Sequence, residues 1–202
     1  MMPETKGLLV VFSGPSGSGK GTVLAEVMKR YPDMEFSVSA TTRAPREGEQ
    51  DGVNYFFKTK EEFQSMAENG GFIEWAQFCE NCYGTPRAYV ESRLEQGKDV
   101  VLEIEVQGAM QVKEAYPDAV LIFNLPPSMQ ELENRLIGRN TEPLDVVNKR
   151  LETAKSELKV SDRYDYVIVN DVVETAAEKF IAILRSEKCK AERNISLLKE
   201  FK

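Results

Sequence analysis

Short apolar runs alternate along this chain with longer segments in which apolar residues recur at steps of three and four. Four of the runs have the composition of buried strands, and they cover residues 8–12, 100–106, 120–125 and 166–169. Continuous apolar strands separated by helical segments are typical of a parallel sheet covered on both faces. The pattern therefore predicts an α/β fold.

Two segments have a clear helical period. After the first predicted strand, Val23, Leu24 and Val27 share one helical face, and Pro32 is expected to stop this helix. Between residues 171 and 202, apolar positions again recur at mostly three, four or seven residues. This second pattern predicts one long amphipathic helix that packs across the core.

Two regions interrupt the alternation of strands and helices. Residues 38–95 are richer in polar and aromatic residues, and we expect an inserted lobe with short strands and one or two helices. Residues 128–159 are charged and mostly helical in pattern, broken at Gly138 and Pro143, which is typical of an exposed lid. The rest of the chain is the predicted core: 1–37, 96–127 and 160–202.

A glycine-rich loop lies between the first predicted strand and the helix that follows it. Its residues are Gly14, Pro15, Ser16, Gly17, Ser18, Gly19, Lys20, Gly21 and Thr22. Backbone N–H groups in such a loop form a concave anion site, and the helix adds the positive end of its dipole. Lys20 is placed to reach the β- and γ-phosphates of a nucleotide.

The end of this loop departs from the usual pattern, in which Ser or Thr follows the lysine directly. Here Gly21 intervenes and the hydroxyl group comes at Thr22. The pattern therefore leaves two alternatives for a magnesium ion: Thr22 contacts it directly, or only through a water molecule.

The composition narrows the chemistry that the chain can perform. The 202 residues are enough for one α/β domain with small insertions. The sequence holds no histidine, which excludes Ser-His triads, zinc–imidazole sites and histidine acid–base catalysis. A net charge of −7 argues against bulk nucleic-acid binding, so phosphate recognition must be local and made by a few arginines.

The sequence also bears on where the chain is expected to act. No apolar stretch approaches the roughly 20 residues that a membrane helix needs. The N-terminus lacks the basic start and long apolar core of a secretory signal. We therefore expect a cytoplasmic protein that does not bind a membrane.

Arginines form two groups outside ordinary surface helices. Arg43 and Arg46 flank Pro45 in a loop and can converge on one anion, although a pair of solvated surface arginines is an equal alternative. Arg135 and Arg139 share a helical face, where like charges repel unless an anion bridges them. A plain surface helix is again the alternative.

Polar residues also follow two of the predicted strands. Strand alternation places Glu103 and Glu105 on the same side of the sheet near the carboxyl end of a strand, which favours contacts with a ligand or with hydrated magnesium. The alternative is a strand end that frays into solvent. Asn170 and Asp171 follow the last strand, where nucleotide contacts are expected, although Asn-Asp is also a common turn pair.

Several sequence blocks together resemble the guanylate kinase family, over about residues 8–171. Besides the glycine-rich loop, the blocks are Ser37-Val-Ser-Ala-Thr-Thr-Arg-Ala-Pro-Arg46, Tyr55-Phe-Phe, Phe72-Ile-Glu-Trp-Ala, Tyr83-Gly-Thr, Glu103-Ile-Glu-Val-Gln-Gly and Arg139-Asn-Thr-Glu. The first and the Glu-Trp-Ala blocks are much more specific than the loop.

This resemblance implies a magnesium-dependent kinase that moves the γ-phosphate of ATP to GMP, and by extension to dGMP, on a P-loop core with a GMP-binding lobe and a helical lid. Arg43, Arg46, Tyr55 and Tyr83 would hold the GMP phosphate. Glu74 and Thr85 would read the guanine edge, and Ser39 and Glu105 would complete the guanine site. Gly84 and Glu103 would also belong to the GMP site.

The same resemblance assigns the residues of the reaction itself. Lys20, Arg46, Arg139 and Arg150 would stabilise the transferring phosphoryl group. The ATP site would comprise the loop, Arg135, Asn170 and Asp171. No nucleic-acid, membrane or protein partner is implied.

Two other functions are weighed against this one. A non-catalytic scaffold of the same fold would bind protein partners through the lobe. Such a scaffold would be expected to lose Lys20 or the lid arginines, and this chain retains all of them. A kinase of the same fold could instead act on a sugar phosphate. Such an acceptor needs no guanine reader, and Ser39, Glu74 and Thr85 argue against it.

Overall fold

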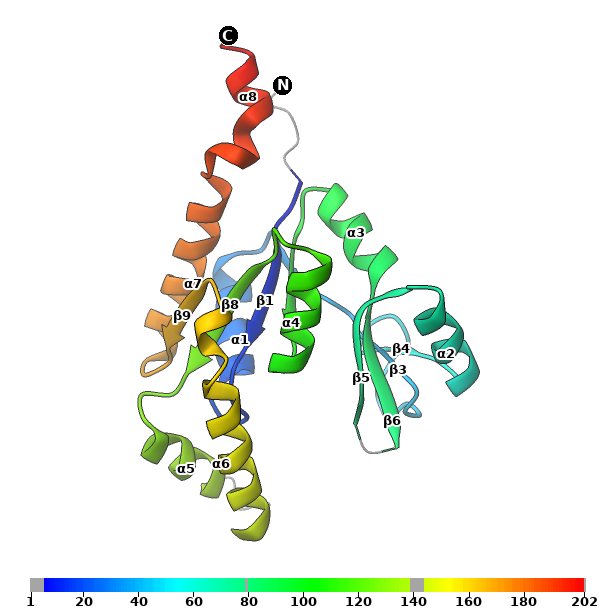
Figure 1. Cartoon of the computed structure of the whole chain (residues 1–202), viewed down its shortest axis with the longest axis vertical. Coiled ribbons are helices and arrows are strands. Elements are labelled where there is room, and N and C mark those ends of the chain that lie inside the picture. The colour runs from blue at the N-terminus through cyan, green and yellow to red at the C-terminus, as the bar shows by residue number, and fades with distance from the viewer. Residues whose placement is uncertain (1–5, 79, 139–143, 202) are drawn as a thin grey trace.

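The core of the protein is a five-stranded parallel sheet, as expected for an α/β fold (Figure 1). The computed structural model describes residues 6–78, 80–138 and 144–201. In spatial order the strands are β2 (Met34–Phe36), β7 (Asp99–Glu103), β1 (Leu9–Ser13), β8 (Val120–Leu125) and β9 (Tyr166–Val169). Because all five run in the same direction, their carboxyl ends meet at one edge of the sheet.

Helices cover both faces of this sheet. On one face, α1 (Lys20–Arg30) and α7 (Val173–Lys188) pack against strand residues such as Phe12, whose ring meets that of Phe180 at 5.1 Å. On the other face lie α3 (Arg87–Glu95) and α4 (Val106–Ala115). The two faces take alternate residues of β1, which explains why the strand reads as an unbroken apolar run.

A second, mixed sheet forms a lobe beside the core (Figure 1). Its strands, in spatial order, are β4 (Phe56–Phe57), β3 (Ala40–Thr41), β6 (Asn81–Pro86) and β5 (Phe72–Phe78). Helix α2 (Lys60–Glu68) begins at a capping box made by Thr59 and Glu62, and it packs Phe63 on Phe72 at 4.4 Å. Helix α3 then leads back to the core, where its Val90 and Leu94 are buried.

Two further helices pack on each other below the sheet in Figure 1. These are α5 (Met129–Ile137) and α6 (Leu144–Leu158), which share a small apolar cluster that includes Leu132, Leu136 and Val147. Gly138 is the C-cap of α5. The short 3₁₀ helix η1 (Ser161–Arg163) connects α6 to β9.

The predicted strand 100–106 is shorter than the apolar run suggested. β7 ends at Glu103, and Glu105 is already the N-cap of α4. The reason is the spacing that follows, because Val106, Ala109 and Val112 recur every three residues and are buried as a helical face. Strand alternation therefore does not relate Glu103 to Glu105, and that part of the prediction was wrong.

The prediction of one long C-terminal helix was also wrong. Helix α7 ends at Lys188 and is followed by η2 (Ala191–Asn194) and α8 (Ile195–Lys199). Lys190 has an extended backbone, with φ −58° and ψ 134°, so the helical hydrogen-bond ladder cannot continue through it. No helix in the described ranges is long and apolar enough to cross a membrane.

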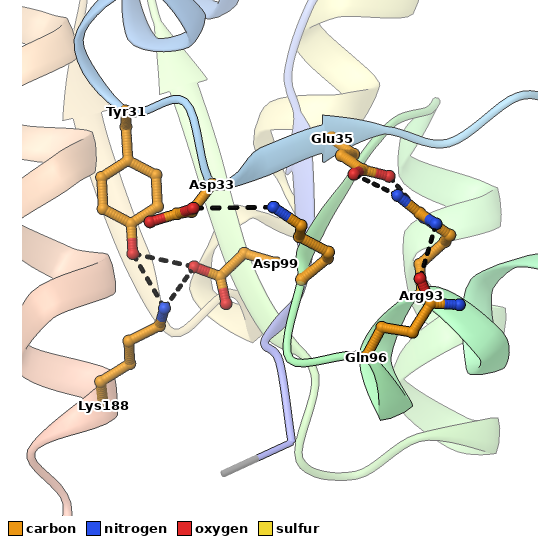
Figure 2. Close-up of polar contacts among 8 residues, drawn as sticks. Tyr31, Asp33, Glu35, Arg93, Gln96, Asp99 and Lys188 are labelled. Atoms are coloured by element: carbon orange, nitrogen blue, oxygen red, sulfur yellow. Dashed lines mark hydrogen bonds and ion pairs between the residues drawn. The ribbon is translucent and has the colours of Figure 1, made fainter. Parts of the chain in front are cut away.

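Helix α7 is held at its last turn by a buried carboxylate (Figure 2). Asp99, which has no exposed surface, accepts from the Leu8 N–H at 2.9 Å and from the Tyr31 hydroxyl at 2.9 Å. The Lys188 ammonium lies 2.7 Å from the same carboxylate. Beside this cluster, the Arg93 guanidinium on α3 pairs with Glu35 on β2. These contacts tie neighbouring elements together at the edge opposite the glycine-rich loop.

Candidate functional site

The glycine-rich loop follows β1 at the carboxyl edge of the sheet and wraps around an open pocket. The pocket has a volume of about 440 Å³. It is lined by Ser16, Gly17, Gly19, Lys20, Gly21, Thr22 and Glu103. The Lys20 ammonium donates to the Gly14 carbonyl at 2.6 Å and to the Pro15 carbonyl at 3.3 Å, so its stem lies along the loop. Such a loop at a helix start is a site for phosphate groups.

The shape of this loop depends on glycine at position 19. Gly19 is the N-cap of α1 and has φ 85°, in the left-handed region. A Cβ atom there would lie 2.6 Å from Nδ2 of Asn170. Any other residue would be strained and would also push against the segment after β9.

A cleft of about 430 Å³ lies between the lobe and the core. From the lobe it is lined by Ser39, Tyr55, Glu74, Ala76, Gln77, Tyr83 and Gly84. From the core it is lined by Lys20, Glu103, Ile104, Glu105, Gln107 and Gly108. Two residues, Lys20 and Glu103, line both this cleft and the pocket inside the glycine-rich loop, which is called the phosphate pocket below. The two hollows therefore meet at the end of the glycine-rich loop.

The polar centre of the cleft is Glu74 on β5, whose side chain is largely buried. Its Oε1 accepts from the hydroxyl of Thr85 on β6 at 2.6 Å. Its Oε2 faces α4, where a Cβ atom at Gly108 would lie only 2.9 Å away. Burial raises the pKa of Glu74 above its ordinary value, although the hydrogen bonds from Thr85 act in the opposite direction.

The structure brings Arg43 together with two tyrosines beside the cleft. The Arg43 guanidinium pairs with Glu49 at 2.8 Å and lies 5.4 Å from the centre of the Tyr55 ring. The Tyr55 and Tyr83 rings are 6.1 Å apart, and both line the cleft. Arg46 is joined to the same loop by its backbone N–H, which donates to Glu49 at 2.7 Å, and its side chain is exposed.

Glu103 and Glu105 both line the cleft, although they lie on different elements. Glu103 ends β7, and a Cβ atom at Gly21 would lie 3.8 Å from its carboxylate. Burial raises the pKa of Glu103, and the neighbouring charge of Lys20 lowers it. The carboxylate of Glu103, an exposed residue, therefore lies beside the start of α1.

Arg135 and Asn170 contact the back of the glycine-rich loop. Arg135 donates to Glu131 at 2.8 Å and to the Asn170 carbonyl at 3.2 Å. The Asn170 side chain donates to the Ser18 carbonyl at 2.8 Å, whereas Asp171 is exposed. Arg150 lies on α6. Arg139 lies outside the described residues.

Sequence reasoning missed six residues at this site. Five of them line the cleft: Ala76, Gln77, Ile104, Gln107 and Gly108. The sixth, Asn124, contacts the back of the loop. Gln107 and Gly108 belong to one of the family blocks, but that block implied no role for them. Asn124 is a polar residue inside the apolar run 120–125, and that mismatch is a signal that could have found it.

Comparison with known proteins assigns nearly the whole chain to one family. The guanylate kinase family model matches residues 6–187. The chain belongs to the guanylate kinase family. The match spans the glycine-rich loop, the lobe, α5, α6 and nearly all of α7, so the family includes every element that borders the two hollows.

Curated relatives and a solved structure agree with this family. A guanylate kinase of Bacillus anthracis is 54% identical over 201 residues, covering 99% of this chain and 98% of its own length. A guanylate kinase of Halalkalibacterium halodurans is 52% identical, covering 96% and 95%. The crystal structure of guanylate kinase from Anaplasma phagocytophilum is 36% identical, covers 98% and 95%, and has a TM-score of 0.75.

Proposed function

We propose that this chain is a nucleoside monophosphate kinase that transfers the γ-phosphate of ATP to GMP, giving ADP and GDP. The observation that carries the proposal is the junction of the two hollows at Lys20 and Glu103. One hollow is built to hold phosphates and the other holds a buried carboxylate that can read a base. A donor and an acceptor bound in them would bring their phosphates together at the end of the loop.

Glu74 supplies the base preference. When ionised, its carboxylate accepts hydrogen bonds only, and guanine offers two donors, the N1–H and the 2-amino group. Adenine has an acceptor at N1 and lacks the 2-amino group, so the carboxylate would face a lone pair. Thr85 holds Oε1 at 2.6 Å, and Ser39 and Glu105 line the same cleft around the base.

The phosphate of the acceptor would lie beside Tyr55 and Tyr83. Arg43 stacks near Tyr55, and Arg46 is on the same loop. Arginine makes paired, charge-assisted hydrogen bonds to phosphate oxygens, so this corner suits a phosphate monoester. Arg43 is bound to Glu49 in the structure, and we infer that the phosphate competes with Glu49 for it.

The reaction itself needs positioning and charge stabilisation rather than a protein nucleophile, because the GMP phosphate attacks. Lys20 and Arg46 are proposed to stabilise the charge on the transferring group, together with Arg139 and Arg150 of the lid. Arg135 and Asn170 support the back of the loop that holds ATP, with Asp171 close to the adenine.

A magnesium ion fits the residues at the junction. Thr22 and Glu103 bring oxygen atoms to the phosphate pocket, and oxygen is the ligand that magnesium prefers. No group of three acidic or cysteine residues that could hold a metal occurs in the described ranges, so phosphates and water would complete the shell. The ion would supply positive charge that neutralises the phosphates of ATP. We also propose the cytoplasm as the place where the chain acts.

A coupled assay of ADP formation with GMP, dGMP, AMP and a sugar phosphate tests the proposal. We expect turnover with GMP, and with dGMP, and little with AMP. A chain that served as a scaffold would turn over none of them, and a sugar kinase would prefer the sugar phosphate. Absence of activity with GMP would overturn the proposal.

The arginine assignments are tested separately. Replacing Arg46 by Ala is expected to lower kcat about a hundredfold or more while the fold remains intact. The matched control is Arg185→Ala, an exposed arginine on α7. Wild-type turnover in Arg46→Ala would contradict a catalytic role for this side chain.

A further inference from the structure

The carbonyl of Ser18, in the middle of the glycine-rich loop, is held from behind by two buried amides. Nδ2 of Asn124 donates to it at 2.9 Å, and Nδ2 of Asn170 donates to it at 2.8 Å. The Arg135 guanidinium also points to it at 3.5 Å. Asn124 and Ser18 have no exposed surface, and Asn170 has 3%.

Because the peptide group is planar, the hydrogen bonds to the Ser18 carbonyl also fix the direction of the Gly19 N–H. The carbonyl of Ser18 and the N–H of Gly19 belong to one peptide plane, and in a trans peptide they point in opposite directions. Holding the carbonyl toward the sheet therefore turns the Gly19 N–H toward the phosphate pocket, which Gly19 lines. No acceptor for that N–H exists among the residues described.

Packing alone does not explain why position 124 holds an asparagine. It lies near the end of an otherwise apolar strand, β8, and its Oδ1 is buried with no hydrogen-bond donor in the described part of the chain. A buried acceptor without a partner destabilises the folded state, and an apolar side chain of the same shape would avoid this. Stability therefore disfavours asparagine here, whereas its Nδ2 donor has a defined target.

Asn124 is also in contact with the start of the loop. Its backbone carbonyl lies where a Cβ atom at Gly14 would be only 2.3 Å away, and its Nδ2 additionally donates to Oγ of Ser18 at 3.1 Å. One residue thus touches both the first glycine of the loop and the peptide at its centre. β8 pairs directly with β1, the strand that leads into the loop. The sheet therefore holds Asn124 at a fixed place relative to the loop.

We propose that Asn124 is a positioning residue for the ATP phosphates: it fixes the Ser18–Gly19 peptide so that the Gly19 N–H faces the donor nucleotide. The inference rests on the proposed function of the loop as the ATP site. It assigns Asn124 no contact with GMP, because it does not line the cleft between lobe and core.

The test compares Asn124→Leu, which keeps the shape and removes the donor, with the wild-type chain. Calorimetric titration with magnesium and ADP is expected to give a Kd about five- to tenfold higher in the variant, the loss of one or two hydrogen bonds. The KM for ATP is expected to rise by a similar factor, while the Kd and KM for GMP stay unchanged. Asn124→Leu removes the unpartnered Oδ1 but also removes the donor to the buried Oγ of Ser18, so the two effects oppose each other and the thermal midpoint is expected to change little.

The control is Ile122→Val, a buried residue two positions earlier on β8, which is expected to lower stability without changing ADP binding. Should Asn124→Leu fail to fold, Asn124→Ala removes the same donor without added bulk. Equal ADP affinity in variant and wild type, or an equal loss of ADP and GMP affinity, would overturn the inference. A wild-type chain that binds no ADP would overturn both the inference and the proposed function.

Discussion

At the scale of single residues, Glu74 has the surroundings that bear most directly on substrate choice. It is buried, it is held at Oε1 by Thr85, and its Oε2 fits against α4 because position 108 has no side chain. A carboxylate fixed in this way offers acceptors at defined places. It follows that small changes at Glu74 or Gly108 should alter GMP use while leaving ATP use intact.

Replacing Glu74 by Gln keeps the shape but puts an amide donor where guanine also donates. We expect kcat/KM for GMP to fall about a hundredfold or more, because charge-assisted hydrogen bonds are lost and a donor faces a donor. The KM for ATP should stay the same, measured in the coupled assay. Glu68→Gln, an exposed change on α2, serves as the control. A parallel rise in both KM values would contradict a role in base recognition.

The raised pKa of Glu74 predicts a pH dependence with two opposite signs. The proposed reading of guanine needs the ionised form of Glu74. The kcat/KM for GMP should therefore decline as the pH falls through this raised pKa, at a higher pH than for an ordinary carboxyl group. The stability of the unliganded fold should change the other way. Because folding raises this pKa, the folded state favours the protonated form, and stability falls as the pH rises through it. Glu74→Gln should remove both effects in pH–rate profiles and urea titrations.

Gly108→Ala tests the close approach of Glu74 to α4. Alanine in a helix interior is more favourable than glycine by about 0.5–1 kcal/mol, so the substitution should not weaken the helix itself. A Cβ atom 2.9 Å from Oε2 would nevertheless displace the carboxylate. We expect a higher KM for GMP at an unchanged KM for ATP, with Glu114→Ala on the same helix as the control. An unaltered KM for GMP would show that the cleft can adjust.

At the scale of elements, the end of α7 is fixed by charge rather than by its apolar stripe. The Lys188 ammonium reaches Asp99 at the start of β7, and Asp99 also accepts from Tyr31 at the end of α1 (Figure 2). The same carboxylate accepts from the Leu8 N–H before β1. The last residue of the helix is therefore anchored to the sheet, and the chain becomes extended two residues later, at Lys190. Its apolar face alone, read along the sequence, continued past this point.

This ion pair predicts an asymmetry between its two partners. Lys188→Met leaves a fully buried carboxylate without its cation and should lower the free energy of unfolding by about 2 kcal/mol. Asp99→Asn leaves a lysine that is 39% exposed and can turn to water, so it should cost only about 1 kcal/mol. Urea unfolding measures both. Lys29→Met, in an exposed pair, should change stability by less than about 0.5 kcal/mol. The opposite order would mean that the hydrogen bonds of Asp99, rather than its charge pairing, dominate.

At the scale of the whole molecule, the two hollows are built from parts that are separate in the chain. The cleft takes one wall from the lobe and one from the core, and it opens into the phosphate pocket at Lys20 and Glu103. Phosphoryl transfer to an acceptor other than water requires that water be excluded, which favours closure of the lobe over the bound nucleotides.

Closure predicts a change of overall size that solution scattering can measure. With saturating GMP and ADP together, the radius of gyration should decrease relative to the unliganded chain, because GMP, in its proposed position, would contact both walls of the cleft. Under the same conditions Glu74→Gln, with weakened GMP binding, should show a smaller decrease. An unchanged radius in the wild-type chain at saturation would mean that the lobe is already in its final position.

The sequence by itself determined the elements that have a strong local period. The strands 120–125 and 166–169 and the helix after the glycine-rich loop all followed from the spacing of apolar and glycine residues. The same loop lines a pocket, and phosphate binding there stays a prediction. Two predictions were wrong. The run 100–106 contains both a strand period and a helical period, and the helix α4 begins directly after Glu105. The predicted long C-terminal helix ends at Lys188, as α7. The short strands β3 and β4 carry no such signal, because their pairing rather than their own residues defines them.

Only the tertiary structure decided which distant residues meet. Asn124 and Ser18 are 106 positions apart, and Gly108 faces Glu74 across two elements. Asp99 and Lys188 are joined across the sheet. Local period is a property of neighbouring residues and can be read along the chain, whereas these contacts depend on how rigid layers pack. The sequence thus determined that a glycine-rich loop joins a strand to a helix, and the packing decided which side chains hold its peptides and which residues line the cleft beside it.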